Sequence, residues 1–303
     1  MSDAAFYHTT VLLKEAVDGL NIKTDGVYVD ATMGGGGHSR EILSRLGKNG
    51  KLIAFDQDED AWRNKPEDNR LIAVPENFRY LKQFLRLHKV PQVDGILADL
   101  GVSSYQFDKA ERGFSTRFEG KLDMRMDKRT ATTAESILRE YNEQQLHKMF
   151  ELNGEVRNAR QLAKHIFQNR NKGGLNSIEA FKAMIEPVVK GLPNKYWAQV
   201  FQALRIEVND ELGALKDFLT QTAPCLKQGG RLSIITFHSL EDRLVKQYIK
   251  QGGWEEEATD IFGRKLSESS LKAINNKPIE PTPEELKENT RARSARLRIA
   301  EKQ

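Results

Sequence analysis

The chain has 303 residues, which is longer than one typical domain, and 39% of them are hydrophobic, which is enough for a sizeable core. Its 47 basic and 43 acidic residues leave a net charge of +4, which suits an anionic partner without requiring one. The single cysteine, Cys225, excludes an internal disulfide framework and a zinc site built from several cysteines. No apolar stretch is long enough to span a membrane and the N-terminus lacks signal-peptide features, so we expect a soluble, cytoplasmic protein.

The first part of the chain predicts a helix, a strand and a glycine turn. Apolar residues between positions 11 and 17 recur at helical spacing after a threonine that can cap the helix. Residues 27–29 then predict a buried strand that ends at Asp30. A turn of four glycines follows, and helical spacing begins at His38. The four glycines are Gly34, Gly35, Gly36 and Gly37. Strand, glycine turn and helix in this order are typical of a nucleotide-type site, because glycine has no Cβ to obstruct a ligand.

The glycine turn is not a phosphate-binding P-loop, because no Lys followed by Ser or Thr comes after its last glycine. Residues 51–55 predict a second strand, and Asp56 follows it. Asp56 lies roughly 20 residues after the glycines, where an acid can accept hydrogen bonds from both ribose hydroxyls. This combination favours a ligand site over the alternative, a flexible surface turn.

Two more strands complete a predicted parallel sheet. A helix at 58–64 leads to a third strand at 70–74, and Phe78 stands just after that strand. Phe78 can cover an adenine ring or belong to the core, and the sequence supports both readings equally. A helix at 81–87 leads to a fourth strand at 93–98, with Asp99 at its carboxyl end. We expect Asp30, Asp56 and Asp99 to converge at one edge of a doubly wound sheet.

A helical insertion is predicted after the fourth strand. Helical patterns occupy 134–150, 156–168 and 177–189, so we expect a sheet domain of residues 1–104 and 197–303 and an inserted domain of residues 105–196. The insertion begins with aromatic residues interleaved with cations, a pattern that suits single-stranded RNA or a flipped nucleotide. These residues are Phe107, Arg112, Phe114, Arg117, Phe118, Lys121, Arg125, Lys128 and Arg129. The alternative is a charged lid that packs its own phenylalanines.

The last third of the chain predicts the rest of the sheet. A long helix at 197–223 precedes a fifth strand at 232–237, and His238 stands at the end of that strand. Ser239 is the expected cap of the next helix. Residues 251–290 are polar and lack periodicity, so we expect a long connection there. Residues 295–299 alternate apolar side chains with arginines, which predicts an edge strand with one cationic face.

Seven motifs of this chain together resemble a known family. In order they are HTTVLLKEAVDGL, DATMGGGGHS, DGILADLGVSS, ERGFS, LDMRMD, RLSIITFHSLEDR and RARSARLRIAE. They are similar to motifs of the MraW, or RsmH, bacterial methyltransferases, which modify the N4 amine of a cytidine in the decoding region of 16S ribosomal RNA. The resemblance spans nearly the whole chain. It implies a class I S-adenosylmethionine-dependent methyltransferase fold with an inserted α-helical domain for substrate recognition.

The resemblance also implies roles for particular residues. The family's cofactor contacts fall on the glycine turn, with Gly36, Gly37 and His38 in direct contact, and on Asp56, Phe78, Asp99 and Gln106. A cytosine amine is a poor nucleophile, so the enzyme must hold it in line with the methyl group and accept its protons, a role that fits Asp99. Typical amino-methyltransferases have two prolines after this acid, whereas this chain reads DLGVSSY. This departure leaves His238 as a second candidate acceptor. No metal is expected.

Two other functions fit parts of the pattern. One is a ribosome-assembly protein that binds RNA and keeps the methyltransferase fold without catalysis. The other is a nicotinamide-dependent dehydrogenase, because the glycine turn and Asp56 also suit that cofactor. The partner that the resemblance implies is 16S rRNA in the small ribosomal subunit or its late precursor, and a homodimer is left open.

Overall fold

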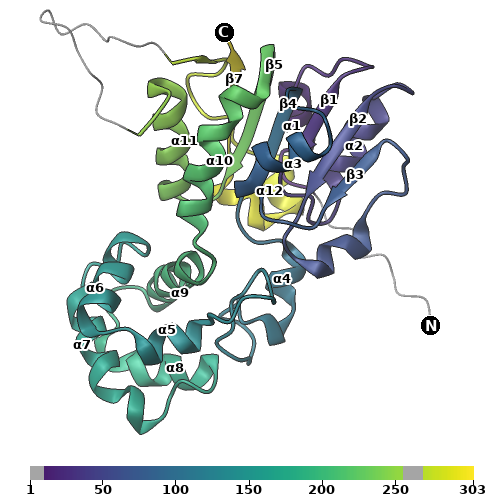
Figure 1. The fold of residues 1–303 in the computed structure, drawn as a ribbon. Coiled ribbons are helices and arrows are strands. Elements are labelled where there is room, and N and C mark those ends of the chain that lie inside the picture. The colour runs from purple at the N-terminus through teal and green to yellow at the C-terminus, as the bar shows by residue number, and fades with distance from the viewer. Residues whose placement is uncertain (1–9, 255–268) are drawn as a thin grey trace, which may run out of the picture. The chain divides into compact units, whose positions relative to one another are not determined.

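The computed structural model describes residues 10–254 and 269–303 and contains two compact units (Figure 1). We call residues 1–101 and 213–303 the sheet unit and residues 102–212 the helical unit. A membrane-spanning helix is absent from the described part of the chain.

The sheet unit is built on seven strands in the order β3-β2-β1-β4-β5-β7-β6. The strands are β1 (Val27–Asp30), β2 (Lys51–Phe55), β3 (Leu71–Val74), β4 (Val93–Asp99), β5 (Leu226–Thr236), β6 (Leu271–Ala273) and β7 (Arg296–Lys302). The first five are parallel, whereas β7 runs antiparallel to both β5 and β6. This confirms the doubly wound class I sheet. A dinucleotide-binding sheet has the order 3-2-1-4-5-6, so the inserted antiparallel β7 argues against the dehydrogenase reading.

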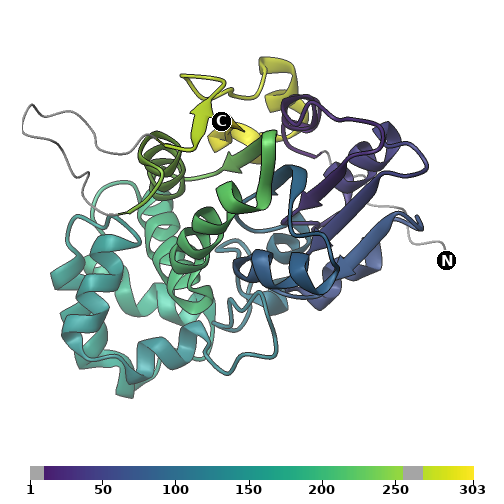
Figure 2. The ribbon, with the colours of Figure 1, turned by 45° about the horizontal axis from the view of Figure 1, so that its top comes forward.

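Helices cover both faces of this sheet, as Figure 1 and Figure 2 show. One face packs against α3 (Leu81–Leu87), α10 (Glu211–Cys225) and α11 (Ser239–Gln251). The other face packs against α1 (Leu13–Gly19), α2 (Gly37–Arg45) and the 3-10 turn η6 (Thr290–Ser294), which follows α12 (Pro283–Glu288). The helices bury apolar residues at a spacing of three or four, as amphipathic helices on a sheet do.

The sheet unit differs from four expectations. The expected edge strand is β7, which lies between β5 and β6, and its Arg298 is buried in an ion pair with Asp242. The expected cap Ser239 is the first helical residue of α11, and His238 caps the helix instead. A threonine is expected to cap α1, but the cap residue of this helix is Leu12, which makes no side-chain hydrogen bond to it. The expected connection contains β6 and α12 in its described part, and its residues 255–268 lie outside the described residues.

The helical unit has one hydrophobic core and, over residues 102–212, no strand. Its helices are α4 (Ser104–Asp108), α5 (Ala134–Glu140), α6 (Glu143–Leu152), α7 (Ala159–Asn169), α8 (Ile178–Ile185) and α9 (Pro193–Asn209). The pattern at 134–150 forms two helices because Asn142 starts a new one, its side chain accepting the Gln145 N–H at 2.9 Å. The expected helix at 197–223 is also divided, at Asp210, whose φ of 46° is incompatible with a helix. By its contacts, α9 belongs to the helical unit.

Candidate active site

The acids at the ends of β1, β2 and β4 converge, as the sequence predicts. We call Asp30, Asp56 and Asp99 the strand-end acids. The charge of Asp30 acts on both of the others, adding to burial in raising their pKa values. Within residues 10–254 and 269–303, no lysine or arginine forms an ion pair with any of the three. Carboxylates collected in this way without a cation favour a positively charged ligand.

The glycine turn adopts backbone angles that explain two of its glycines. Gly34 and Gly36 have φ values of 48° and 74°, in the left-handed region. A Cβ on Gly37 would overlap the Thr10 side chain, so only glycine fits beside that residue. A Cβ on Gly35 would meet nothing within 4 Å. The turn is therefore open at Gly35, where a ligand can approach the main chain.

Asp56 joins the glycine turn to the end of β2. Its Oδ2 accepts the Gly34 N–H and its Oδ1 accepts the Asp58 N–H, both at 2.8 Å. Burial raises the pKa of Asp56 to about 7, although these two hydrogen bonds act in the opposite sense. A carboxylate has about four lone-pair sites, so Asp56 can accept two further hydrogen bonds from ribose hydroxyls.

Asp99 presents an unused acceptor at the end of β4. Its Oδ1 is buried and has no hydrogen-bond partner among the described residues. Its Oδ2 lies 3.8 Å from Nδ1 of His38. Burial lowers the pKa of His38 to about 4, so this imidazole is neutral at pH 7. Burial first, then the charges of Asp30 and Glu241, raise the pKa of Asp99 well above its ordinary value. A buried oxygen without a partner is costly, which makes it a candidate contact for a ligand.

His238 and Glu241 form a closed pair at the start of α11. Glu241 Oε2 accepts the Phe237 N–H at 2.8 Å and the His238 N–H at 3.3 Å. In return, Nδ1 of His238 accepts the Glu241 N–H at 3.4 Å, and its Nε2 lies 3.1 Å from Glu241 Oε1. Both imidazole nitrogens therefore face Glu241, in a capping box.

Two other predicted cofactor residues have structural contacts of their own. Phe78 is partly buried and packs edge-on against Phe218, with ring centroids 5.1 Å apart. Gln106 belongs to the helical unit, where it is buried and shares a capping box with Ser103. Their roles toward a cofactor remain predictions.

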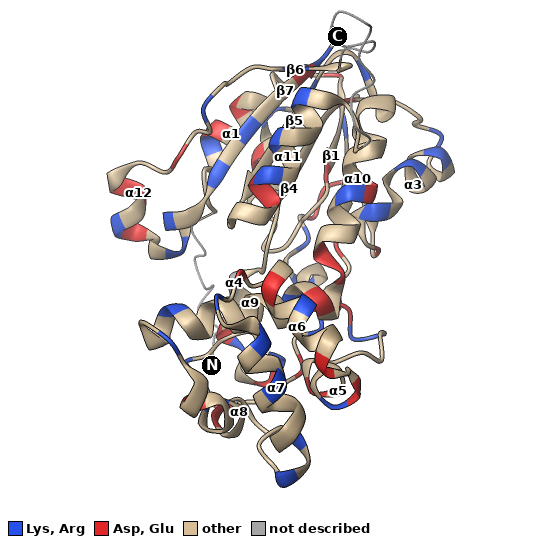
Figure 3. Cartoon of the chain, turned by 90° about the vertical axis from the view of Figure 1, so that its left-hand side faces the viewer, with Lys and Arg blue, Asp and Glu red and all other residues tan. Residues whose placement is uncertain are grey.

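The aromatic and cationic segment of the helical unit is largely folded onto itself. We call residues 110–130 the cationic loop. Phe114 is buried, and so is the Arg112 guanidinium, which donates to the carbonyls of Arg125 and Met126. Arg125 pairs with Asp123 at 2.7 Å. Figure 3 shows that both basic and acidic residues occur in the helical unit.

Only part of the cationic loop presents groups to solvent that a phosphate or base could contact. Phe118 is 44% exposed. Arg117 and Lys121 are exposed, and their side chains form no ion pair with any described residue. The structure therefore supports the lid reading for Phe114 and Arg112, and leaves exposed side chains, among them Arg117, Phe118 and Lys121, for an RNA contact.

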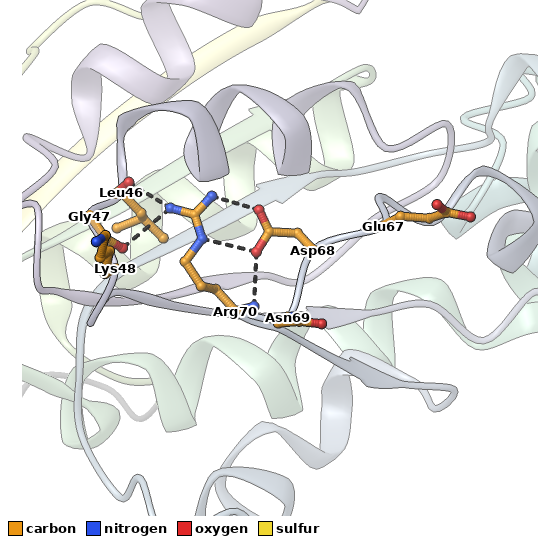
Figure 4. A pocket seen from close by; sticks show the side chains of 7 residues that line it. All are labelled: Leu46, Gly47, Lys48, Glu67, Asp68, Asn69 and Arg70. Carbon is orange, nitrogen blue, oxygen red and sulfur yellow. Dashed lines mark hydrogen bonds and ion pairs between the residues drawn. The ribbon is translucent and has the colours of Figure 1, made fainter.

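A pocket in the sheet unit lies away from the strand-end acids. It is lined by Leu46, Gly47, Lys48, Glu67, Asp68, Asn69 and Arg70 (Figure 4), next to the amino ends of β2 and β3. The Arg70 guanidinium already binds both oxygens of Asp68 and the carbonyls of Leu46 and Gly47. Because Arg70 and Asp68 satisfy each other, only the exposed side chains of Lys48 and Glu67 bring further charge to the pocket, one of each sign.

Sequence reasoning missed two residues of this site. Thr32 holds the main chain of Asp99 through its hydroxyl, and Glu241 acts on the pKa of Asp99. No pattern marks Thr32, because the contact joins residues 67 positions apart. The expected capping pattern points to Asp242 instead of Glu241, because the sequence predicts a cap at Ser239 and the structure has it at His238.

Comparison with known proteins gives consistent matches over the full chain. The profile of the MraW methylase family matches residues 5–303. A protein of Christiangramia forsetii called ribosomal RNA small subunit methyltransferase H is 53% identical over 298 residues, which cover 98% of each chain. Proteins of the same name from Bacteroides thetaiotaomicron and Flavobacterium psychrophilum are 54% and 55% identical. The matches cover 99% of both chains for the first, and 96% of this chain and 100% of the other for the second.

Proposed function

The chain belongs to the MraW methylase family, and from this we propose that it transfers a methyl group from S-adenosylmethionine to the N4 amine of a cytidine in 16S ribosomal RNA. The observation that carries the proposal is the buried, unpartnered Oδ1 of Asp99 at the end of β4. It supplies an acceptor for an amine proton close to the glycine turn. Membership of a methylase family favours this function over a catalytically inactive RNA-binding protein.

The residues of the sheet unit fit the proposed cofactor. S-adenosylmethionine supplies an electrophilic methyl group on a sulfonium cation and carries a ribose and an adenine. We assign the ribose hydroxyls to Asp56, the methionine end to residues 34–37, with His38 beside them, and the adenine to Phe78. The open position at Gly35 and the uncompensated strand-end acids support this assignment. Gln106 is proposed for the methionine end or the target base.

Asp99 is the proposed catalytic acceptor. The lone pair of the cytosine N4 is delocalised into the ring, so the nitrogen must be oriented and its protons must be accepted. Only the ionised form of Asp99 can take a proton, and burial together with Asp30 and Glu241 disfavours that form. Beside the positive charge of a bound donor, the ionised form becomes favourable again, because an opposite charge lowers the pKa of an acid. Asp99 therefore becomes able to accept a proton once the methyl donor is bound.

His238 is the proposed second acceptor, and its geometry limits how it can act. Its Nδ1 accepts the Glu241 N–H, and its Nε2 faces the Glu241 carboxylate. Nδ1 is therefore already used, and Nε2, which is left for a substrate proton, faces a carboxylate that can compete for that proton. We therefore place Asp99 first in the order of proton acceptance.

We propose residues 105–196 of the helical unit for substrate recognition. The exposed Arg117, Phe118 and Lys121 combine a stacking surface with two cations, the chemistry that single-stranded RNA requires. The proposed setting is the cytoplasm, with 16S rRNA in the small subunit or its late precursor as the substrate.

The test is methylation of small ribosomal subunits isolated from cells that lack this modification. The purified protein and labelled S-adenosylmethionine are incubated with these subunits, and the RNA is digested to nucleosides. We expect the label in N4-methylcytidine, and its loss with Asp99→Asn. Label in another nucleoside, or no transfer to subunits and precursors alike, would contradict the proposal.

A further inference from the structure

A chain of hydrogen bonds joins the glycine-turn helix α2 to the main chain of Asp99. Ser39 of α2 donates its hydroxyl proton to Asp30 Oδ2 at 2.6 Å. The other oxygen of Asp30 accepts the Thr32 N–H at 3.1 Å. The Thr32 hydroxyl oxygen in turn accepts the Asp99 N–H at 2.6 Å. Three elements, α2, the end of β1 and the end of β4, are therefore tied together by side chains.

The position of Thr32 explains why a side chain is needed there. The last regular ladder bond between β1 and β4 is donated by the Ala31 N–H to the Leu97 carbonyl, at 2.8 Å. Beyond it the chain leaves the sheet toward the glycine turn, so β1 has no further main-chain acceptor for Asp99. The Thr32 hydroxyl takes that place. On the other side, the Leu100 N–H is held by the Ile235 carbonyl of β5.

Asp30 holds Thr32 firmly in this position. Asp30 and Ser39 have no solvent exposure, and each carboxylate oxygen of Asp30 has a donor. The Ser39 hydrogen bond has the short length that is typical of a hydroxyl bound to a carboxylate, so it fixes the Asp30 side chain that accepts the Thr32 N–H. Thr32 is therefore attached to a rigid, buried anchor rather than to a mobile loop.

We propose that Thr32 is a positioning residue, which sets the distance between the Asp99 acceptor and the glycine turn through its hydroxyl, with Asp30 as its anchor. The inference rests on the proposed methyl transfer and adds to it Thr32 and Asp30, which act through Asp99. Its consequence follows from the in-line geometry of the transfer, since a displacement of about 1 Å can lower a rate about 100-fold.

The test compares Thr32→Val with Thr32→Ser. Valine keeps the shape of threonine but cannot accept the Asp99 N–H, whereas serine keeps the hydroxyl. We expect Thr32→Val to lower kcat by roughly 10- to 100-fold, while calorimetry shows little change in its affinity for S-adenosylhomocysteine. Thr32→Ser should restore most of the turnover. Thr32→Ala, which also lacks the hydroxyl but adds no bulk, serves if the valine variant does not fold.

Thr222 provides a matched control. It is a fully buried threonine on α10, whose hydroxyl donates to the Leu219 carbonyl at 2.8 Å. Thr222→Val removes a hydroxyl of the same kind away from the strand-end acids, so kcat should stay at the wild-type value.

The outcomes separate this inference from the proposed function. If folded Thr32→Val turns over at the wild-type rate, or loses S-adenosylhomocysteine affinity in proportion to kcat, Thr32 does not position Asp99 and the proposed function is unaffected. If the wild-type protein transfers no methyl group to any small-subunit RNA, both the function and the inference fail.

Discussion

The strand-end acids and the cationic loop use charge in opposite ways. In the loop, burial by itself would raise the pKa of Asp123, but hydrogen bonds from Arg125 outweigh burial and the pKa is lowered. At the ends of the strands no lysine or arginine among the described residues pairs with the acids, and their pKa values are raised by burial in spite of the hydrogen bonds to Asp30 and Asp56. A charged group that the fold already satisfies contributes to structure. A charged group that the fold buries without compensation is available to a ligand.

The largest effect is expected when the unsatisfied acceptor is removed. Asp99→Asn should lower kcat by about 10²- to 10⁴-fold, because the amide cannot accept a proton. The affinity for S-adenosylhomocysteine, measured by calorimetry, should change far less. Asp123→Asn is the matched change in the satisfied pair and should mainly lower the melting temperature. Equal losses of kcat in the two variants would erase the distinction between the two regions.

The next effect is expected at the proposed ribose contact. Asp56→Ala should weaken binding of S-adenosylhomocysteine by about 10- to 100-fold, since hydrogen bonds to a charged group contribute roughly 1.5–3 kcal/mol. Asp68→Ala is the control, because Asp68 forms an ion pair with Arg70, and its affinity for S-adenosylhomocysteine should stay at the wild-type value. Unchanged affinity in Asp56→Ala would remove the ribose assignment.

The exposed cations should affect RNA binding where the paired ones do not. Replacing Arg117 and Lys121 together by alanine should weaken binding to small-subunit RNA by about tenfold and reduce the slope of log K against log salt by about 1–2. Arg125→Ala should leave that slope unchanged, because its guanidinium is held by Asp123 and the Thr130 carbonyl. Filter binding over a range of salt concentrations measures both. If the slope changed only in Arg125→Ala, then Arg125, and not Arg117 and Lys121, would be the residue of the loop that contacts RNA.

The smallest effect concerns stability. Asp56 has a pKa of about 7 in the folded protein against 3.8 for ordinary aspartate, so its contribution to stability is complete below pH 4 and is lost as the pH rises through 7. The free energy of unfolding of the ligand-free protein should fall by about 1 kcal/mol between pH 6.5 and 8.5 from this group. Buried His38 acts in the opposite sense, but only below pH 6.5.

Urea unfolding of the wild type and of Asp56→Asn at several pH values isolates the contribution of Asp56 to the free energy of unfolding. The variant should lose less stability than the wild type over the same pH interval. An identical pH dependence of the two proteins would mean that Asp56 titrates normally and is not buried as described.

The sequence predicts the sheet of this protein far better than its contacts. Runs of apolar residues around Val27 and Leu52 predict the strands. Because the strands are parallel, the acids that follow them must lie at the same edge of the sheet. The resemblance supplies the family. The pairing of Arg125 with Asp123 rather than with RNA depends on a local turn that no periodicity encodes.

Helix boundaries were harder to predict for a similar reason. The apolar spacing continues through Asn142 and Asp210, yet a side-chain cap at the first and a left-handed residue at the second divide each expected helix. The place of β7 between β5 and β6 is a matter of tertiary pairing, and its alternating pattern fits an edge strand equally well.

Because the helical unit interrupts the sheet unit in the sequence, the two units cannot fold at the same time during translation. Residues 102–212 are continuous and share one core, so we expect them to fold as soon as they leave the ribosome. The sheet forms later, because more than a hundred residues separate β4 from its neighbour β5. The second neighbour of β5 is β7, which exists only when residues 296–302 have been synthesised. Until then β5 exposes a row of unpaired main-chain groups that invites aggregation. The sheet unit, which carries the strand-end acids, is therefore begun early in translation and completed only with β7.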